Sequence, residues 1–186
     1  QVQGASGWAT AITEISGKLE EAAPGSVAII GGARQTNEEL YLLKRLAEKL
    51  EAITDSVPRT GKGDRLLSHT DKNPNSTGSK LIGITNGRPG SRIADIVAGI
   101  EDGTIKTLIV FGDDVTKAGI SGALLDKLDL LVVSDILPNN TTSKAHYLLP
   151  GCAHAEKRGT FTNIKGRVQK FMKALEAPGD ARPEWE

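Results

Sequence analysis

The sequence contains very little cysteine and few aromatic residues. Of its 186 residues only Cys152 is a cysteine, and phenylalanine, tryptophan and tyrosine together make up 4%. A single thiol cannot form a disulfide within the chain, and it excludes the Cys-x-x-Cys pattern of metal sites. Any iron–sulfur or structural zinc chemistry would therefore have to come from another polypeptide or from residues outside this sequence.

Net charge and long hydrophobic runs are also absent. Lysine plus arginine and aspartate plus glutamate both number 23, which argues against nucleic-acid binding through bulk positive charge. No apolar run approaches the length that crosses a bilayer. The start, Gln1 to Trp8, lacks both an initiator methionine and the features of a signal peptide. We therefore expect a fragment of a larger cytoplasmic protein, without a nucleic-acid partner and without direct membrane insertion.

Two segments in the first third have the periodicity of helices. The first carries apolar residues at offsets of four, three and four, which define one helix face: Trp8, Ile12, Ile15 and Leu19. The second begins with a capping box, in which Thr36 and Glu39 can each accept a hydrogen bond from the other's backbone N–H. Its apolar stripe is predicted to follow this cap: Leu40, Leu43, Ala47 and Leu50.

Apolar runs and helical patterns alternate along most of the chain. The runs at 27–30, 105–111, 130–133 and 147–149 are predicted to be buried strands. Further helices are expected around residues 93–100, ending near Gly103, and around Leu124 and Leu128. This alternation is typical of a parallel sheet. We predict one three-layer α/β domain over residues 1–186, with a mainly parallel sheet and helices on both faces.

Residues 54–80 depart from this pattern. They have weak periodicity and contain Pro58 and Pro74, and an irregular segment this long is uncommon inside a compact domain. Its basic residues are interspersed with three aspartates: Arg59, Lys62, Arg65, Lys72 and Lys80. Two interpretations stay open, a solvated irregular insertion and a surface that docks another subunit or an anionic group.

Ligands of open α/β sheets bind beyond the carboxyl ends of the strands, and the sequence offers three such places. The glycines at 31–32 lack the G-x-G-x-x-G spacing and indicate a tight turn. The carboxylates of Asp113 and Asp114 could bind Mg²⁺ or a ribose or guanine edge, or could be turn and N-cap residues. After Ser134-Asp135, Thr141 or Thr142 could cap a short helix.

The sequence predicts no catalytic and no metal-ligating residue. Cys152 and His154 do not have a usual zinc spacing, and no fourth ligand accompanies them and His146. A cysteine–histidine nucleophile would need a group that orients the base, and none is evident. Neither a G-x-S-x-G elbow nor a Walker loop occurs.

The C-terminal third resembles a known family. Its residues follow the order and spacing of the signature "LP…aEk.GTfTN.egRvQ" of the molybdopterin oxidoreductase superfamily: Leu148-Leu149-Pro150, Ala155-Glu156-Lys157, residues 159–163 and residues 166–169. Similarity to the family extends to residues 8–19, 37–43, 103–108 and 177–185, and so covers nearly the whole chain. The family includes formate dehydrogenase alpha subunits and the large iron–sulfur subunit of NADH-quinone oxidoreductase (respiratory complex I).

The resemblance implies the central piece of a larger subunit, with iron–sulfur cysteines before it and a pterin-dinucleotide-binding domain after it. The compact length between the second helix and Gly103 favours the large iron–sulfur subunit of complex I. Catalytic members usually have Gly-x-Asn-Pro where this chain has residues 112–115, and Ala-Asp where it has Ala145-His146. Cys152 does not match the position of a molybdenum ligand. These departures imply a vestigial molybdopterin site that is kept as a scaffold.

The resemblance also implies which residues would border the cofactor or its relic: Gly112, Asp113, Asp114, Glu156, Gly159, Thr160, Asn163 and Arg167. Among these, Glu156 and Arg167 are expected to form a partly buried ion pair.

The implied role is mainly structural, in the peripheral electron-transfer arm of a respiratory complex. Partner subunits would hold the domain beside the inner membrane, the iron–sulfur clusters would belong to the parent protein, and no cofactor would be bound by this fragment alone. The alternative is the cofactor-lining domain of a molybdenum enzyme such as a formate dehydrogenase alpha subunit.

Overall fold

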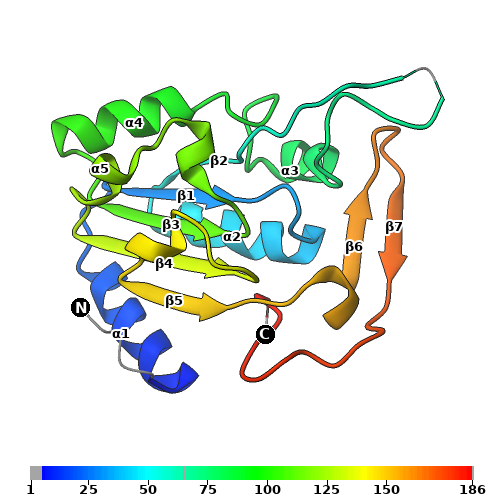
Figure 1. Ribbon diagram of the computed structural model, residues 1–186. Coiled ribbons are helices and arrows are strands. Elements are labelled where there is room, and N and C mark those ends of the chain that lie inside the picture. The colour runs from blue at the N-terminus through cyan, green and yellow to red at the C-terminus, as the bar shows by residue number, and fades with distance from the viewer. Residues whose placement is uncertain (1–5, 65, 186) are drawn as a thin grey trace.

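A five-stranded parallel sheet forms the centre of the computed structural model, which describes residues 6–64 and 66–185. The strand order is β2-β1-β3-β4-β5 (Figure 1). The strands are β1 (Val27–Gly31), β2 (Ile53–Asp55), β3 (Thr107–Phe111), β4 (Leu130–Asp135) and β5 (Tyr147–Pro150). All four neighbouring pairs are parallel. The predicted α/β class and parallel sheet are confirmed.

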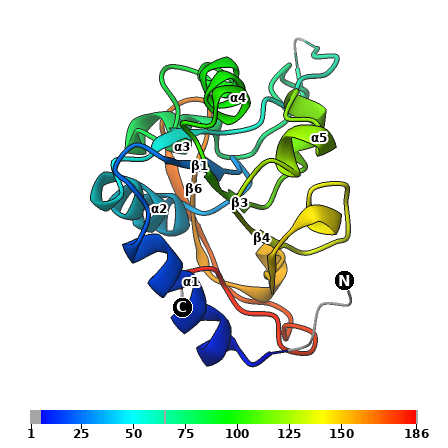
Figure 2. The same cartoon turned by 90° about the vertical axis from the view of Figure 1, so that its left-hand side faces the viewer.

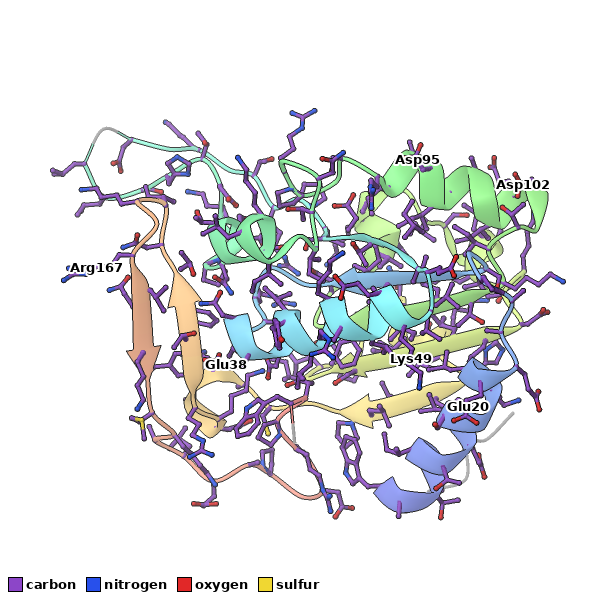
Figure 3. The ribbon with its side chains drawn as sticks, turned by 180° about the vertical axis from the view of Figure 1, so that it is seen from behind. Glu20, Glu38, Lys49, Asp95, Asp102 and Arg167 are labelled. Atoms are coloured by element: carbon purple, nitrogen blue, oxygen red, sulfur yellow. The ribbon has the colours of Figure 1, made fainter. Side chains whose placement is uncertain are left out.

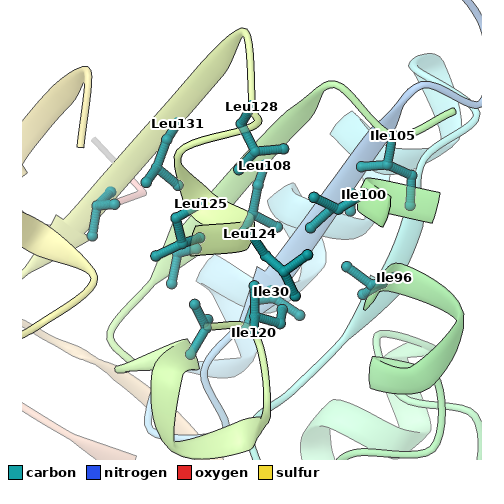
Figure 4. Close-up of a cluster of buried hydrophobic side chains, with 14 of the residues drawn as sticks. Ile30, Ile96, Ile100, Ile105, Leu108, Ile120, Leu124, Leu125, Leu128 and Leu131 are labelled. Atoms are coloured by element: carbon teal, nitrogen blue, oxygen red, sulfur yellow. The ribbon is translucent and has the colours of Figure 1, made fainter. Parts of the chain in front are cut away.

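Helices cover both faces of the sheet (Figure 2). On one face α1 (Trp8–Glu20) and α2 (Asn37–Lys49) pack against Val27 and Ile29 of β1. On the other, α4 (Ile93–Asp102) and α5 (Gly122–Leu125) pack against Ala28 and Ile30, in the cluster that Figure 4 shows. Successive side chains of a strand point to opposite faces. Both faces of β1 are therefore apolar, which explains its continuous hydrophobic run.

Smaller elements complete the fold. The helix α3 (Ser76–Ile82) lies beside α2, and an antiparallel hairpin of β6 (Gly159–Thr162) and β7 (Val168–Phe171) stands beyond the carboxyl ends of the central strands (Figure 1). Three short 3₁₀ turns are η1 (Val115–Ala118), η2 (Thr142–Lys144) and η3 (His154–Glu156). Over the ranges that the structure describes, no helix has both the length and the hydropathy needed to span a bilayer.

Local sequence signals correctly predicted the start of α2 and the end of α4 but missed two other helix details. The capping box of α2 is present, with Thr36 N donating to Glu39 Oε2 at 2.8 Å and Glu39 N to Thr36 Oγ1 at 3.2 Å. Gly103 ends α4 in the left-handed conformation, with φ +79°. Ile12, expected on the buried face of α1, is 49% exposed, because Ala11 and Ile15 centre that face on another line. Leu128 is buried but lies beyond the end of α5.

The segment predicted to be irregular begins with β2 and ends with α3. Between them an antiparallel bridge joins Thr60 and Asp71. The Lys72 ammonium donates to the carbonyl oxygens of Lys62 at 2.8 Å and His69 at 2.6 Å, so this cation orders its own loop. Arg65, one of the basic residues noted in the sequence, lies outside the described residues.

Candidate functional site

A pocket of about 320 Å³ lies at the carboxyl ends of the parallel strands. The strand order reverses between β1 and β3, and such a reversal is where open α/β sheets usually bind ligands. The segments after β1, β3 and β5 and the end of β4 all contribute to the pocket wall, through Arg34, Gly112, Cys152 and Asp135 among others. We call this feature the central pocket. Its outer wall includes Phe161 of the hairpin.

Glycines let the polar groups of this edge approach one another. A Cβ on Gly32 would lie 2.5 Å from the Phe111 carbonyl oxygen, and one on Gly151 would lie 2.5 Å from Glu184 Oε1. Gly112 adopts φ +67°, and a Cβ there would lie 2.8 Å from Gln35 Nε2. The close approach of backbone and side chains at the pocket therefore depends on the absence of side chains at strand ends.

One lysine and two carboxylates form a buried cluster at the central pocket, in which Lys157 and Glu184 line the pocket and Glu39 lies behind them. Lys157 Nζ donates to Glu39 Oε1 at 2.7 Å, to Glu184 Oε2 at 2.8 Å and to Gln35 Oε1 at 3.1 Å. The side chains of Lys157, Glu39 and Glu184 are only 3%, 1% and 4% exposed. We call these three residues the floor cluster. When all three are ionised, the cluster carries one uncompensated negative charge.

Burial and proximity shift the pKa values of the floor cluster. Burial, assisted by the charge of Glu184, raises the pKa of Glu39 to about 7, and Lys157 offsets this only in part. Burial lowers the pKa of Lys157, but the charges of Glu184 and Glu39 outweigh it, so this pKa is raised overall. The lysine therefore stays charged, and Glu39 is the carboxylate whose proton affinity burial raises.

A second buried ionic group, the Asp113 cluster, consists of Asp113, Arg59 and Arg34. Arg59 donates through Nε at 3.1 Å and Nη2 at 2.6 Å to Asp113 Oδ1, and Arg34 Nη2 lies 4.0 Å from the same oxygen and donates to the Gly112 carbonyl. Burial raises the pKa of Asp113, although Arg59 opposes this shift. Within the described ranges, Asp113 Oδ2 and Arg34 Nε have no hydrogen-bond partner.

Of the eight residues expected to border a cofactor, Gly112 lines the central pocket. Asp113 faces guanidinium groups rather than an open cation site. Asp114 caps η1: its Oδ1 accepts from Thr116 N at 3.3 Å and from Thr141 Oγ1 at 2.9 Å. Thr141 Oγ1 in turn accepts from Val115 N.

The other five lie before or within the hairpin and hold its backbone. Thr160 Oγ1 donates to Glu38 Oε1 at 2.9 Å, and Asn163 Oδ1 accepts from Arg167 N at 3.0 Å. A Cβ on Gly159 would lie 2.6 Å from Thr36 Cγ2, so this glycine lets the hairpin approach the start of α2.

The expected ion pair between Glu156 and Arg167 is wrong. In the described part of the chain they form no such pair. Glu156 Oε2 accepts from the backbone N–H of Ala153 at 2.8 Å, at the base of the hairpin. Arg167 lies in the far turn and points outward (Figure 3). The length of the hairpin keeps the two apart.

The sequence did not predict the floor cluster. Glu39 was recognised as a capping residue and Lys157 as part of a motif, but their positions are 118 residues apart and Glu184 comes from a third segment. A buried charge needs a partner of opposite charge. Lys157, a lysine within the family motif, is therefore the feature of the sequence that could have indicated a buried ion pair. It does not indicate which carboxylates meet it.

The central pocket has the groups needed to bind a flat, polar, heterocyclic ligand. Asp135 and Glu184 can accept hydrogen bonds, Arg34 can donate them, and Phe161 supplies an aromatic surface. Its volume suits one end of a pterin or nucleotide rather than the whole group. Across the described residues no cluster of three or more histidine, cysteine, aspartate or glutamate side chains is placed to hold a metal ion.

Comparison with known proteins gave consistent matches. The family model described as "Molybdopterin oxidoreductase" matches residues 52–186. The NADPH-Fe(3+) oxidoreductase subunit alpha of Geobacter sulfurreducens is 41% identical over 101 residues, which cover 52% of this chain and 12% of the relative. A putative formate dehydrogenase of Staphylococcus aureus is 30% identical over 189 residues, covering 96% of this chain and 19% of the relative. The chain thus spans less than a fifth of the length of these relatives.

Proposed function

Because the chain belongs to the molybdopterin oxidoreductase family, we propose that it is one domain of a large oxidoreductase subunit and that the central pocket forms one wall of that subunit's cofactor site. The observation that carries this proposal is the position of the pocket, at the reversal of strand order and among the glycine-rich strand ends. The proposal extends to a single domain over residues 1–186, with the rest of the site supplied by other parts of the parent protein.

The residues of this chain would bind and orient one end of a pterin-type cofactor. Asp135 and Glu184 would accept hydrogen bonds from its N–H groups, Arg34 would face its anionic groups, and Phe161 would contact its ring. A bound molybdenum–pterin group supplies oxidation–reduction chemistry, whereas this chain supplies position and charge.

Two measurements on the full-length protein from its own host test this proposal: elemental analysis for molybdenum, and pterin fluorescence after oxidation. We expect stoichiometric amounts of both. A folded, iron-containing parent without molybdenum and pterin would overturn it.

A Gly112→Ala substitution tests the pocket directly. The added Cβ would lie 2.8 Å from Gln35 Nε2, so the pocket wall must shift and we expect a several-fold loss of bound pterin. Gly103→Ala is the matched control, because Gly103 also has positive φ, +79°, but has open space around a Cβ. Both variants carry the same type of backbone strain. Equal pterin content in the two variants would contradict a cofactor wall at Gly112.

A second candidate function is a scaffold, as in the large iron–sulfur subunit of a respiratory complex I. The observation that favours it is the structural use of the expected cofactor residues: Asp114 caps a turn, and Thr160 and Asn163 hold the hairpin. In that case the partners would be other subunits of a membrane-associated complex, and iron–sulfur clusters elsewhere in the parent would carry the electrons. Absence of molybdenum from an intact, electron-transferring parent supports this candidate over the first.

A further inference from the structure

We propose that the floor cluster is a proton-binding site coupled to the central pocket, so that an anionic group bound in the pocket causes the cluster to take up a proton. Glu39, Lys157 and Glu184 would thereby compensate the charge of a ligand that they do not need to touch. The inference deepens the proposed function and rests on it, because it uses the same pocket.

The first support is the charge balance of the cluster. One ammonium lies within hydrogen-bond distance of two carboxylates, and all three side chains are almost fully buried. A buried charge without a counter-charge is unfavourable, and protonation of one carboxylate removes it. One proton held between the two carboxylates would therefore make the cluster neutral.

The hydrogen bonds show how such a proton can be accommodated. Glu39 is held at both oxygens, by Lys157 Nζ and by the backbone N–H of Thr36. Glu184 Oε1 accepts two long hydrogen bonds, at 3.3 Å from Gln35 Nε2 and at 3.5 Å from Ser134 Oγ. Protonation at either carboxylate leaves Lys157 with one full ionic partner. The cluster can thus gain a proton without losing the salt bridge that closes the floor.

The charged groups around the cluster are few. Lys157 comes from the segment after β5 and Glu184 from the C-terminal segment, and both act on Glu39 of α2. The pocket adds Arg34, Asp135 and His154. Burial and the charge of Glu184 raise the pKa of Glu39, and the charges of Glu184 and Glu39 raise that of Lys157, so within the floor cluster Glu39 is the group whose proton affinity is raised towards neutral pH.

The second support is that the cluster and the pocket share their wall. Lys157, Glu184 and Gln35 line the central pocket directly. Arg34, on the same wall, keeps its Nε without a hydrogen-bond partner in the described ranges, which leaves a cationic donor for an anion. A negative charge held there raises the proton affinity of the carboxylates. At such short range we expect the midpoint to move upward by about one pH unit.

Carbon-13 NMR of the 186-residue chain, labelled at the glutamate carboxyl carbons, tests the proposal. The chain is titrated from acid to alkaline pH, with and without inorganic pyrophosphate as the anionic probe. We expect one glutamate carboxyl with a midpoint near pH 7, and a higher midpoint when pyrophosphate is bound. Glutamates that all titrate below about pH 5.5 would overturn the proton site. A near-neutral midpoint that pyrophosphate does not move would overturn the coupling.

Two variants and one control assign the signal. Glu39→Gln should abolish the near-neutral titration, and Glu184→Gln should lower the midpoint of Glu39, because it removes the neighbouring negative charge. Glu48→Gln, an exposed carboxylate on the same helix, should leave both unchanged. A Glu184→Gln variant with the same midpoint as the wild type would contradict the shared site even if Glu39→Gln fails to fold.

The outcome is separable from that of the proposed function. The titration is observed on this chain without any cofactor. A parent lacking molybdenum would refute the cofactor wall and leave the proton site standing, whereas a molybdenum-containing parent with only acidic glutamate midpoints would do the reverse.

Discussion

Two buried ionic clusters lie at the carboxyl edge of the sheet, and they have opposite compositions. The floor cluster places one cation between two carboxylates, whereas the Asp113 cluster places one carboxylate against two arginines. In the floor cluster every charged side chain is buried, but Arg59 and Arg34 are 35% and 38% exposed. Water can screen the excess charge of the second cluster and not that of the first. The loss of stability on mutation of each cluster therefore depends on the burial of its side chains as well as on its numbers of cations and carboxylates.

The largest loss of stability is expected from Lys157→Met in the floor cluster. It removes the only cation between Glu39 and Glu184, and we expect a loss of about 3–5 kcal/mol in the free energy of unfolding near pH 8. The loss should shrink at pH 5, because the carboxylates can then protonate. Urea unfolding at both pH values measures it. Lys144→Met is the control, since its exposed pair with Asp126 should contribute less than about 1 kcal/mol.

The raised pKa of Glu39 predicts that the stability of the protein depends on pH. The folded pKa of Glu39, about 7, lies above the ordinary value of 4.5, so between these pH values the folded state binds more protons than the unfolded state. The free energy of unfolding should therefore fall as pH rises through this window, by at most about 3 kcal/mol. Urea unfolding series at several pH values measure this slope. Glu39→Gln should flatten it, and a slope unaffected by that substitution would contradict the assignment.

A smaller effect is expected from Asp113→Asn. The substitution removes the negative charge that Arg59 and Arg34 share, but solvent screens those arginines, and we expect a loss of about 1–2 kcal/mol. Thermal and urea unfolding of the Asp113→Asn and Lys157→Met variants measure which of the two loses more stability. Equal losses in the two variants would show that exposure of the arginines does not relieve the unpaired charge.

Sequence patterns predicted the fold better than the site. Buried strands such as β3 are recognisable from continuous apolar residues, and the α2 cap from a four-residue signature, because both depend on neighbours in sequence. The position of Gly112 was predictable for the same reason, as it directly follows a strand. Lys157 and Glu184 meet Glu39 only through the tertiary fold, and no local pattern records that meeting.

The failed pairing of Glu156 with Arg167 has the same origin. The resemblance implied that the two residues meet, but β6 runs outward between them, so Glu156 lies at the base of the hairpin and Arg167 in its far turn. Likewise Ile12 matches a helical period but not the line of α1 that meets the sheet. The hydrophobic period predicts the type of secondary structure, whereas tertiary packing determines which of its residues are buried.

The contact between Lys157 and Glu39 spans 118 positions, and that with Glu184 spans a further 27. Contacts of such long sequence separation form late in folding, because the intervening chain must be ordered first. A nascent chain contains Lys157 and Glu39 before Glu184 is added, so until then Glu39 is the carboxylate of the floor cluster that is available to Lys157. The order of the residues along the chain thus makes the Lys157–Glu39 pair available before the second carboxylate is present.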